Sequence, residues 1–228
     1  MKLVIFDLDQ TLVDVVPVHD RAATAVFKHF FGVDGHITEV EFAGRSLIEN
    51  FLAVAQLKSI PEQSVLEKMP AMLDYYDKAF IESFPADCSK CVLPGARELL
   101  DALAGTGNIL ALYTGDSEAV ASIMLERTAL DHYFRIRFFG TEVKRRPDMI
   151  TLARNKAAKL AGRPFSGEDI VVVGDSIKDI EAGKEHKART VAIATGSYPE
   201  MELSRYGPDF VFEDMEDWRK VMAAILDQ

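Results

Sequence analysis

The fold of this chain is decided by the stretch Leu3-Val4-Ile5-Phe6-Asp7-Leu8-Asp9-Gln10-Thr11-Leu12. Its apolar start predicts a buried strand, and two carboxylates separated by one residue follow. Strand side chains alternate, so Asp7 and Asp9 point to the same side if the strand continues that far. Like charges this close need compensation, most simply by a cation. Taken alone, the stretch also fits a strand capped by acidic turn residues, so the rest of the chain decides between a structural and a functional interpretation.

Composition and charge limit the class of protein. The chain has 228 residues, of which 48% are hydrophobic and 27% charged, an ordinary globular balance with enough chain for a full-sized core. The net charge of −10 argues against nucleic acid and anionic membrane surfaces as partners. No apolar run approaches the ~18–20 residues of a membrane span, and the N-terminus lacks the features of a signal peptide. We therefore expect a cytoplasmic protein.

The two cysteines occur together as Cys88-Ser89-Lys90-Cys91. This spacing suits a redox pair or half of a zinc site, but the sequence has no second Cys or His pair to complete a zinc site. Free, reduced thiols in a connecting segment are the favoured interpretation.

Apolar residues recur at helical spacing in the first part of the chain after Leu12. The pattern predicts helices over 17–31, 45–57 and 61–84, with Pro70 as a candidate break in the third. No strand-like alternation interrupts them. We therefore expect residues 15–90 to form a small helical module inserted after the first strand.

Short apolar strands alternate with helices from Pro94 onward. The predicted strands are 108–113, 136–139, 169–174, 189–194 and 209–212, and the predicted helices are 95–104, 117–127, 147–161, 177–186 and 214–226. This alternation predicts a doubly wound parallel α/β sheet with helices on both faces. The expected domains are a core of residues 1–14 and 91–228 and an inserted helical cap of residues 15–90.

Polar clusters follow two further strands and occupy a loop between them. They are Thr114-Gly115-Asp116-Ser117, Lys144-Arg145-Arg146-Pro147-Asp148, and Gly174-Asp175-Ser176-Ile177-Lys178-Asp179. Each has a structural explanation by itself, as a capped helix start, a solvated basic turn, or acids at a helix N-terminus. Ligands bind at the carboxyl ends of parallel strands, and together these clusters describe a site for Mg²⁺ and phosphate.

In order and spacing, the first stretch and these clusters resemble the four motifs of the haloacid dehalogenase-like (HAD) hydrolase superfamily. The helical insertion resembles the C1 cap of its phosphoglycolate phosphatase and β-phosphoglucomutase-like branch. The resemblance implies a Rossmann-like core and Mg²⁺ as cofactor. It further implies that Asp7 is the nucleophile that forms a phosphoaspartate and that Asp9 is the general acid and base. Asp7, the backbone carbonyl of Asp9, Asp175 and Asp179 would hold the metal.

The resemblance also assigns the phosphate-binding groups. Thr114, the amide of Gly115 and Lys144 would bind phosphoryl oxygens. Lys144 is preferred to Arg145 because the family lysine usually stands four residues before an Asp. Gln10 occupies a turn position where the family commonly has Gly, so some backbone strain is expected there.

Asp9 favours phosphate-ester chemistry, because resembling dehalogenases and phosphonatases lack this second acid. The expected activity is hydrolysis of a small phosphorylated metabolite, phosphoglycolate-like or a sugar phosphate. A sugar phosphomutase is the alternative, since Val18-His19-Asp20-Arg21-Ala22 resembles β-phosphoglucomutase. That family's basic residues around the cap glycine are replaced here by Ala43 and Leu47, however. His19 is therefore interpreted as a cap-entrance residue and Arg45 as a candidate substrate contact.

A third alternative is non-enzymatic. A phosphoaccepting signalling domain also combines acids, Thr and Lys on a parallel sheet. Such receiver domains are about half this length, and their phosphorylated Asp ends an internal strand, so this interpretation is the least favoured.

Overall fold

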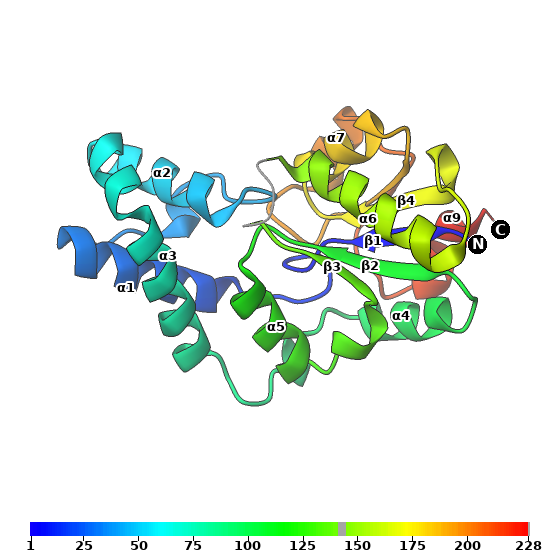
Figure 1. The fold of residues 1–228 in the computed structure, drawn as a ribbon, viewed down its shortest axis with the longest axis horizontal. Helices are drawn as coiled ribbons and strands as arrows, with labels where there is room; N and C mark the ends of the chain where they lie inside the picture. Colours follow the sequence, from blue (N-terminus) through cyan, green and yellow to red (C-terminus); the bar gives the residue numbers. More distant parts are fainter. Residues whose placement is uncertain (141–144, 228) are drawn as a thin grey trace.

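A central parallel sheet organises the molecule (Figure 1). The computed structural model describes residues 1–140 and 145–227, and within them it has one six-stranded sheet of order β3-β2-β1-β4-β5-β6. The strands are β1 (Leu3–Phe6), β2 (Ile109–Tyr113), β3 (Ile136–Phe138), β4 (Ile170–Gly174), β5 (Arg189–Ile193) and β6 (Phe210–Phe212). All pairings are parallel. The strand order reverses beside β1, which is where an open α/β sheet binds its ligands.

Helices cover both faces of this sheet. They are α4 (Ala96–Ala104), α5 (Glu118–Arg127), α6 (Arg146–Ala161), α7 (Ile177–Glu185), α8 (Glu200–Arg205) and α9 (Trp218–Leu226). Leu3 and Ile5 share one apolar cluster with α6 and α7, and Val4 and Phe6 share another with α4, α5 and α9. Because successive side chains of β1 point to opposite faces of the sheet, this strand contributes to the apolar clusters on both faces. The expected doubly wound α/β fold is confirmed.

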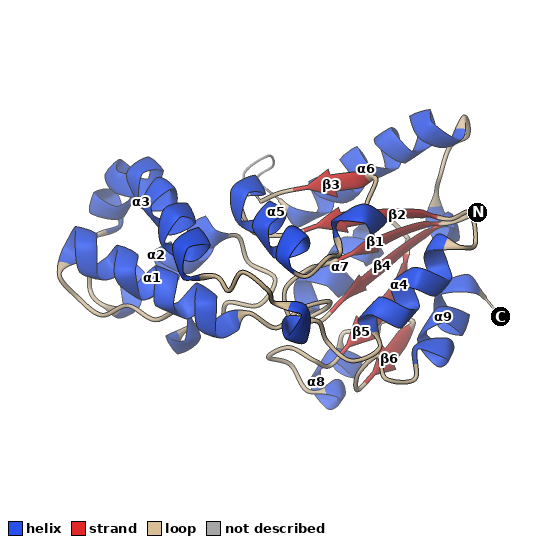
Figure 2. Cartoon of the chain, turned by 90° about the horizontal axis from the view of Figure 1, so that it is seen from below, coloured by secondary structure: helices blue, strands red, loops and turns tan. Residues whose placement is uncertain are grey.

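Three further helices lie together beyond the carboxyl ends of the strands, as both views show (Figures 1 and 2). They are α1 (Val16–Phe31), α2 (Leu47–Leu57) and α3 (Glu62–Ser83). α3 runs through Pro70 without a break, because buried residues before and after it, including Met69 and Met72, pack on the neighbouring helices. The division into a core of residues 1–14 and 91–228 and a cap of residues 15–90 stays a prediction.

The interpretation of the cysteines as free thiols was wrong, because Cys88 and Cys91 form a disulfide. A short 3-10 helix at Ser89–Cys91 turns the chain and brings the two Cα atoms to 5.2 Å, within the range that a disulfide spans. The spacing in the sequence permitted this pair, but the turn that closes it is a feature of the folded chain.

The short helix α8 was not predicted. It has six residues, of which only Leu203 is buried. The sequence therefore shows no periodic apolar pattern that would predict a helix there. In the described parts of the chain, no helix combines the length and the apolar character that crossing a bilayer requires. The expected cytoplasmic location stays a prediction.

Ala129 gives a test of the local backbone. It follows α5 with a φ of +53°, and the Leu130 amide donates to the Leu125 carbonyl at 2.9 Å, as in a helix end that favours glycine. We expect Ala129→Gly to raise the free energy of unfolding by about 0.5–1 kcal/mol, because the left-handed conformation costs alanine more than glycine. Urea titration measures the change.

Ala71, exposed within α3, is the matched control. Ala71→Gly should lower the free energy of unfolding by about 1 kcal/mol, since glycine is a poor helix former. Equal destabilisation by both substitutions would contradict the assigned backbone conformation at Ala129.

Candidate functional site

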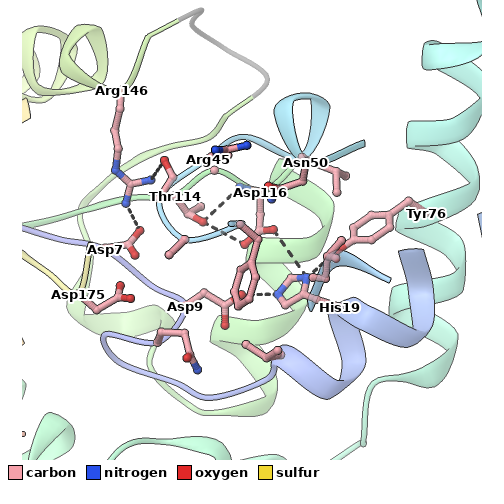
Figure 3. A pocket seen from close by; sticks show the side chains of 18 residues that line it. Asp7, Asp9, His19, Arg45, Asn50, Tyr76, Thr114, Asp116, Arg146 and Asp175 are labelled. Carbon is pink, nitrogen blue, oxygen red and sulfur yellow. Dashed lines mark hydrogen bonds and ion pairs between the residues drawn. The ribbon is translucent and has the colours of Figure 1, made fainter. Parts of the chain in front are cut away.

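Three buried polar residues lie side by side at the carboxyl ends of neighbouring strands (Figure 3). Asp7 follows β1, Thr114 follows β2 and Asp175 follows β4, and they are 5%, 2% and 2% exposed. The pairing of β1 with both β2 and β4 brings these strand ends together. The Asp7 amide donates to the Val173 carbonyl at 2.9 Å, which holds Asp7 beside β4.

Asp7, Asp175 and Asp179 form a buried acidic group. Each offers a carboxylate oxygen within 4.8 Å of the others, and Asp179 is held in the first turn of α7 by a capping box with Ser176. Burial raises the pKa of Asp7 to about 7, with Asp179 adding to the rise against the opposing charge of Arg146. Burial and the charges of Asp7 and Asp179 raise the pKa of Asp175 well above its usual range.

This acidic group has the donor chemistry of a Mg²⁺ site. Hard carboxylate oxygens are the ligands that this ion prefers, and a divalent cation would offset the burial and the mutual repulsion that raise the two pKa values. Thr11 donates its hydroxyl to Asp175 Oδ1 at 3.1 Å and so orients one of the candidate ligands. The residues present fit the expected metal.

Arg146 is the functional residue that sequence reasoning missed. Its Nη2 lies 2.5 Å from Asp7 Oδ1 and 2.7 Å from Asp179 Oδ1, and its guanidinium stacks on the Tyr113 ring. Lys144, the cation expected in this loop, lies outside the described residues. The local signals for Arg146 were its place in the basic cluster 144–148 and its position directly before Pro147, which favours a helix start.

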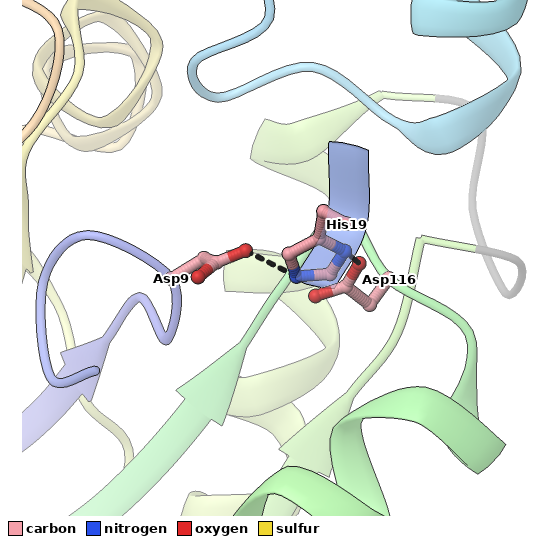
Figure 4. A group of neighbouring side chains, drawn as sticks. All are labelled: Asp9, His19 and Asp116. Atoms are coloured by element: carbon pink, nitrogen blue, oxygen red, sulfur yellow. Dashed lines mark ion pairs between the residues drawn. The ribbon is translucent and has the colours of Figure 1, made fainter. Parts of the chain in front are cut away.

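His19 connects two further carboxylates, Asp9 and Asp116 (Figure 4). Its Nε2 lies 2.5 Å from Asp9 Oδ2 and its Nδ1 lies 3.9 Å from Asp116 Oδ1. Nδ1 also shares a hydrogen bond with the Tyr76 hydroxyl. Burial alone would lower the pKa of His19, but the charges of Asp9 and Asp116 outweigh it and raise the pKa to about 9. His19 is therefore protonated at neutral pH.

The side chains of Asp7 and Asp9 belong to different clusters, because β1 ends at Phe6. The chain then turns through Gln10, whose φ is +60°, in the left-handed region where strain was expected for a residue other than glycine. The alternation of a strand therefore does not reach Asp9. Its expected metal contact is through the backbone carbonyl, and that assignment stays a prediction.

A cavity that is open to solvent joins both clusters. Its wall includes the candidate residues Asp7, Asp9, His19, Arg45, Thr114, Gly115 and Asp175, and also Asn50, Tyr76, Asp116 and Arg146. At this cavity the loop before α2 lies close against the loop after β2, because a Cβ on Gly115 would collide with the Arg45 carbonyl.

Comparison with known proteins adds independent information. A family model described as haloacid dehalogenase-like hydrolase matches residues 4–193. The phosphoglycolate phosphatase of Pseudomonas syringae pv. tomato is 29% identical over 231 residues, which cover 99% of this chain and 80% of that protein. Phosphoglycolate phosphatase 1 of Pseudomonas aeruginosa is 30% identical over 222 residues, covering 95% of this chain and 78% of that protein.

Solved structures share the fold. A hydrolase from Pseudomonas syringae superposes with a TM-score of 0.68 at 24% identity, covering 96% of this chain and 97% of that one. A β-phosphoglucomutase from Clostridium difficile has a TM-score of 0.72 at 17% identity, covering 100% of this chain and 98% of that one. The family model spans most of the sequence and includes the strand ends that carry the site. The expected resemblance is confirmed, and the chain belongs to the haloacid dehalogenase-like hydrolase family.

Proposed function

We propose that this protein is a Mg²⁺-dependent phosphatase that hydrolyses a small phosphorylated metabolite, phosphoglycolate-like or a sugar phosphate, through a phosphoaspartate on Asp7. The observation that carries the proposal is the position of Asp7. It is buried between the acidic group and Arg146 at one wall of a cavity that Asp9 also borders. Membership of a hydrolase family and the phosphatase names of the relatives support it.

Asp7 would attack the phosphorus atom and displace the leaving oxygen. Arg146 pairs with Asp7 Oδ1, so we assign Oδ2 as the nucleophilic atom. Arg146 is 7% exposed and also pairs with Asp179. It would therefore act as a positioning residue that fixes the carboxylate of Asp7, in addition to offering positive charge at the cavity wall.

Asp9 would protonate the leaving oxygen and then take a proton from the water that hydrolyses the phosphoaspartate. Nε2 of the protonated His19 lies 2.5 Å from Asp9 Oδ2. The imidazole therefore holds a proton next to the carboxylate that must donate one to the leaving oxygen. His19 would position Asp9 and pass a proton to it as Asp9 protonates the leaving oxygen; the proton that Asp9 then takes from the attacking water would pass back to His19, which closes the cycle.

Thr114, the Gly115 amide and Lys144 would bind phosphoryl oxygens, and Arg45 would contact the substrate from the cap. Asp7, Asp175, Asp179 and the backbone carbonyl of Asp9 would hold Mg²⁺. The ion would supply charge neutralisation for the phosphoryl group during transfer.

A sugar phosphomutase is the second candidate, and the contact of His19 with Asp9 favours it. In the cap opening that resembles β-phosphoglucomutase, His19 is the residue tied to acid–base chemistry. Ala43 and Leu47 still stand where that family has basic residues, so hydrolysis remains the proposal. Product isomers from hexose phosphates, with slow phosphate release, would identify a mutase. The signalling alternative loses its support, because the chain belongs to a hydrolase family.

Asp7→Asn tests the nucleophile. We expect Mg²⁺-dependent phosphate release from a panel of small phosphoesters to fall on the order of 10³-fold or more, because the amide cannot form the covalent intermediate. Asp34→Asn, at a surface carboxylate paired with Lys28, is the control and should keep full activity. Appreciable turnover by folded Asp7→Asn protein would overturn the mechanism.

Arg146→Gln and Arg145→Gln form a matched pair of adjacent substitutions. Arg146 neutralises two buried carboxylates, whereas Arg145 pairs with Glu185 at the surface with 58% of its side chain exposed. In metal-free buffer, Arg146→Gln should lower the free energy of unfolding by about 3 kcal/mol. Arg145→Gln should change it by less than about 1 kcal/mol. Similar values in urea titrations would show that Arg146 is not the buried cation.

Asp175→Asn tests the metal site by a readout other than activity. Mg²⁺ should raise the Tm of the wild-type protein by mass action, and this shift should disappear in the variant. The metal-free variant should be more stable than metal-free wild type, by about 2–4 °C if the relieved repulsion is worth ~1 kcal/mol. An unchanged Mg²⁺ shift in Asp175→Asn would exclude this carboxylate as a ligand.

A further inference from the structure

Asn50 brings an unpaired polar group to the cavity from the cap. It lies in α2, is 8% exposed and lines the cavity, and Figure 3 shows it beside Arg45. Within residues 1–140 and 145–227, its buried side-chain oxygen Oδ1 has no hydrogen-bond partner. Buried acceptors without a partner are rare and costly. The Asn50 oxygen therefore points to a donor that the described residues do not provide.

Two carboxylate oxygens of the same cavity accept no hydrogen bond from residues 1–140 and 145–227. The buried Oδ1 of Asp9 is without a partner in the described chain. Asp116 accepts from the Thr114 hydroxyl through Oδ2 at 3.0 Å, but its Oδ1 lies 3.9 Å from His19, beyond hydrogen-bond distance. These three oxygen atoms, one each on Asn50, Asp9 and Asp116, are thus free to accept a hydrogen bond.

The cations of the cavity already stand in ion pairs, although Nε2 of His19 and Nη2 of Arg146 make no hydrogen bond of good geometry to the described residues. Among the described lining residues, Arg146 faces two buried carboxylates, and His19 faces Asp9 and Asp116. Arg45 pairs with Glu41 at 3.1 Å. A carboxylate on the substrate would have to compete for these cations while lying near unpaired acceptor oxygens. A substrate carboxylate and the Asp9 and Asp116 carboxylates carry like charges and repel one another.

We propose that this cavity selects phosphate monoesters whose organic part carries hydrogen-bond donors, hydroxyl or ammonium, and disfavours those that carry a carboxylate. Asn50 and Asp116 are the specificity-determining residues. Sites built to bond a substrate hydroxyl reject an analogue that lacks it, because their buried polar groups are then left unpaired. The inference rests on the proposed phosphatase activity and, of the two substrate classes proposed for it, favours sugar phosphates over phosphoglycolate-like acids.

Two compounds of nearly equal size test the selectivity, namely 2-hydroxyethyl phosphate and 2-phosphoglycolate. We expect kcat/KM to be at least about 10-fold higher for 2-hydroxyethyl phosphate. O-phosphoethanolamine distinguishes ammonium from hydroxyl as the preferred donor. Ethyl phosphate carries neither and serves as the reference. A preference for 2-phosphoglycolate over 2-hydroxyethyl phosphate would overturn the inference.

Substitutions of Asn50 and Asp116 test whether these two residues cause the substrate selectivity. Asn50→Leu removes the amide at similar volume, so kcat/KM for 2-hydroxyethyl phosphate should fall about 10-fold through KM, with ethyl phosphate little changed. Asn50→Asp keeps an acceptor and should retain the donor-bearing substrates while discriminating more strongly against 2-phosphoglycolate. Asp116→Asn should raise kcat/KM for 2-phosphoglycolate relative to 2-hydroxyethyl phosphate.

Gln56→Leu, at an exposed position of the same helix α2, is the control and should leave the substrate ratios unchanged. Equal losses on all substrates in folded Asn50→Leu and Asn50→Asp would assign Asn50 a structural role and overturn its part in selectivity. If wild-type protein with Mg²⁺ releases no phosphate even from ethyl phosphate or p-nitrophenyl phosphate, the proposed function fails, and the inference fails with it.

Discussion

The structure depends on the convergence of three carboxylates and one guanidinium at the carboxyl ends of the central strands. Asp7, Asp175 and Asp179 are each almost inaccessible to solvent, and Arg146 pairs with two of them. Burying like charges is unfavourable unless a cation is supplied. The three carboxylates therefore need a positively charged partner. Arg146 supplies one positive charge, which does not balance three ionised carboxylates. This imbalance is the physical basis for a divalent-cation site.

The turn after β1 separates two carboxylates that stand close in the sequence. Asp7 stays with the acidic group, while Asp9 passes through the turn at Gln10 and pairs with the buried imidazole of His19. The roles proposed for the two acids, nucleophile for Asp7 and general acid for Asp9, agree with these surroundings, a guanidinium beside one and an imidazole beside the other.

The helical segment completes the cavity through close contacts between backbones. Gly44 has a φ of +69°, and a Cβ there would collide with Ser176, just as one on Gly115 would collide with the Arg45 carbonyl. These small residues let the loop before α2 lie directly on the strand-end loops. As a result, Arg45 and Asn50 reach a site whose remaining groups come from the sheet.

The sequence by itself determined the parallel α/β sheet, the helices inserted after β1 and the strand ends that carry Asp7, Thr114 and Asp175. Apolar periodicity and short polar motifs are local properties of the chain, so they can be read without coordinates. Only the tertiary structure decided the rest. The partnership of Arg146 with Asp7, the burial of His19 beside Asp9, the unpaired oxygen of Asn50 and the disulfide each depend on the packing and turns of the folded chain. Such contacts form because burial removes water from groups that must then find partners, and the sequence pattern does not record which partner lies within reach.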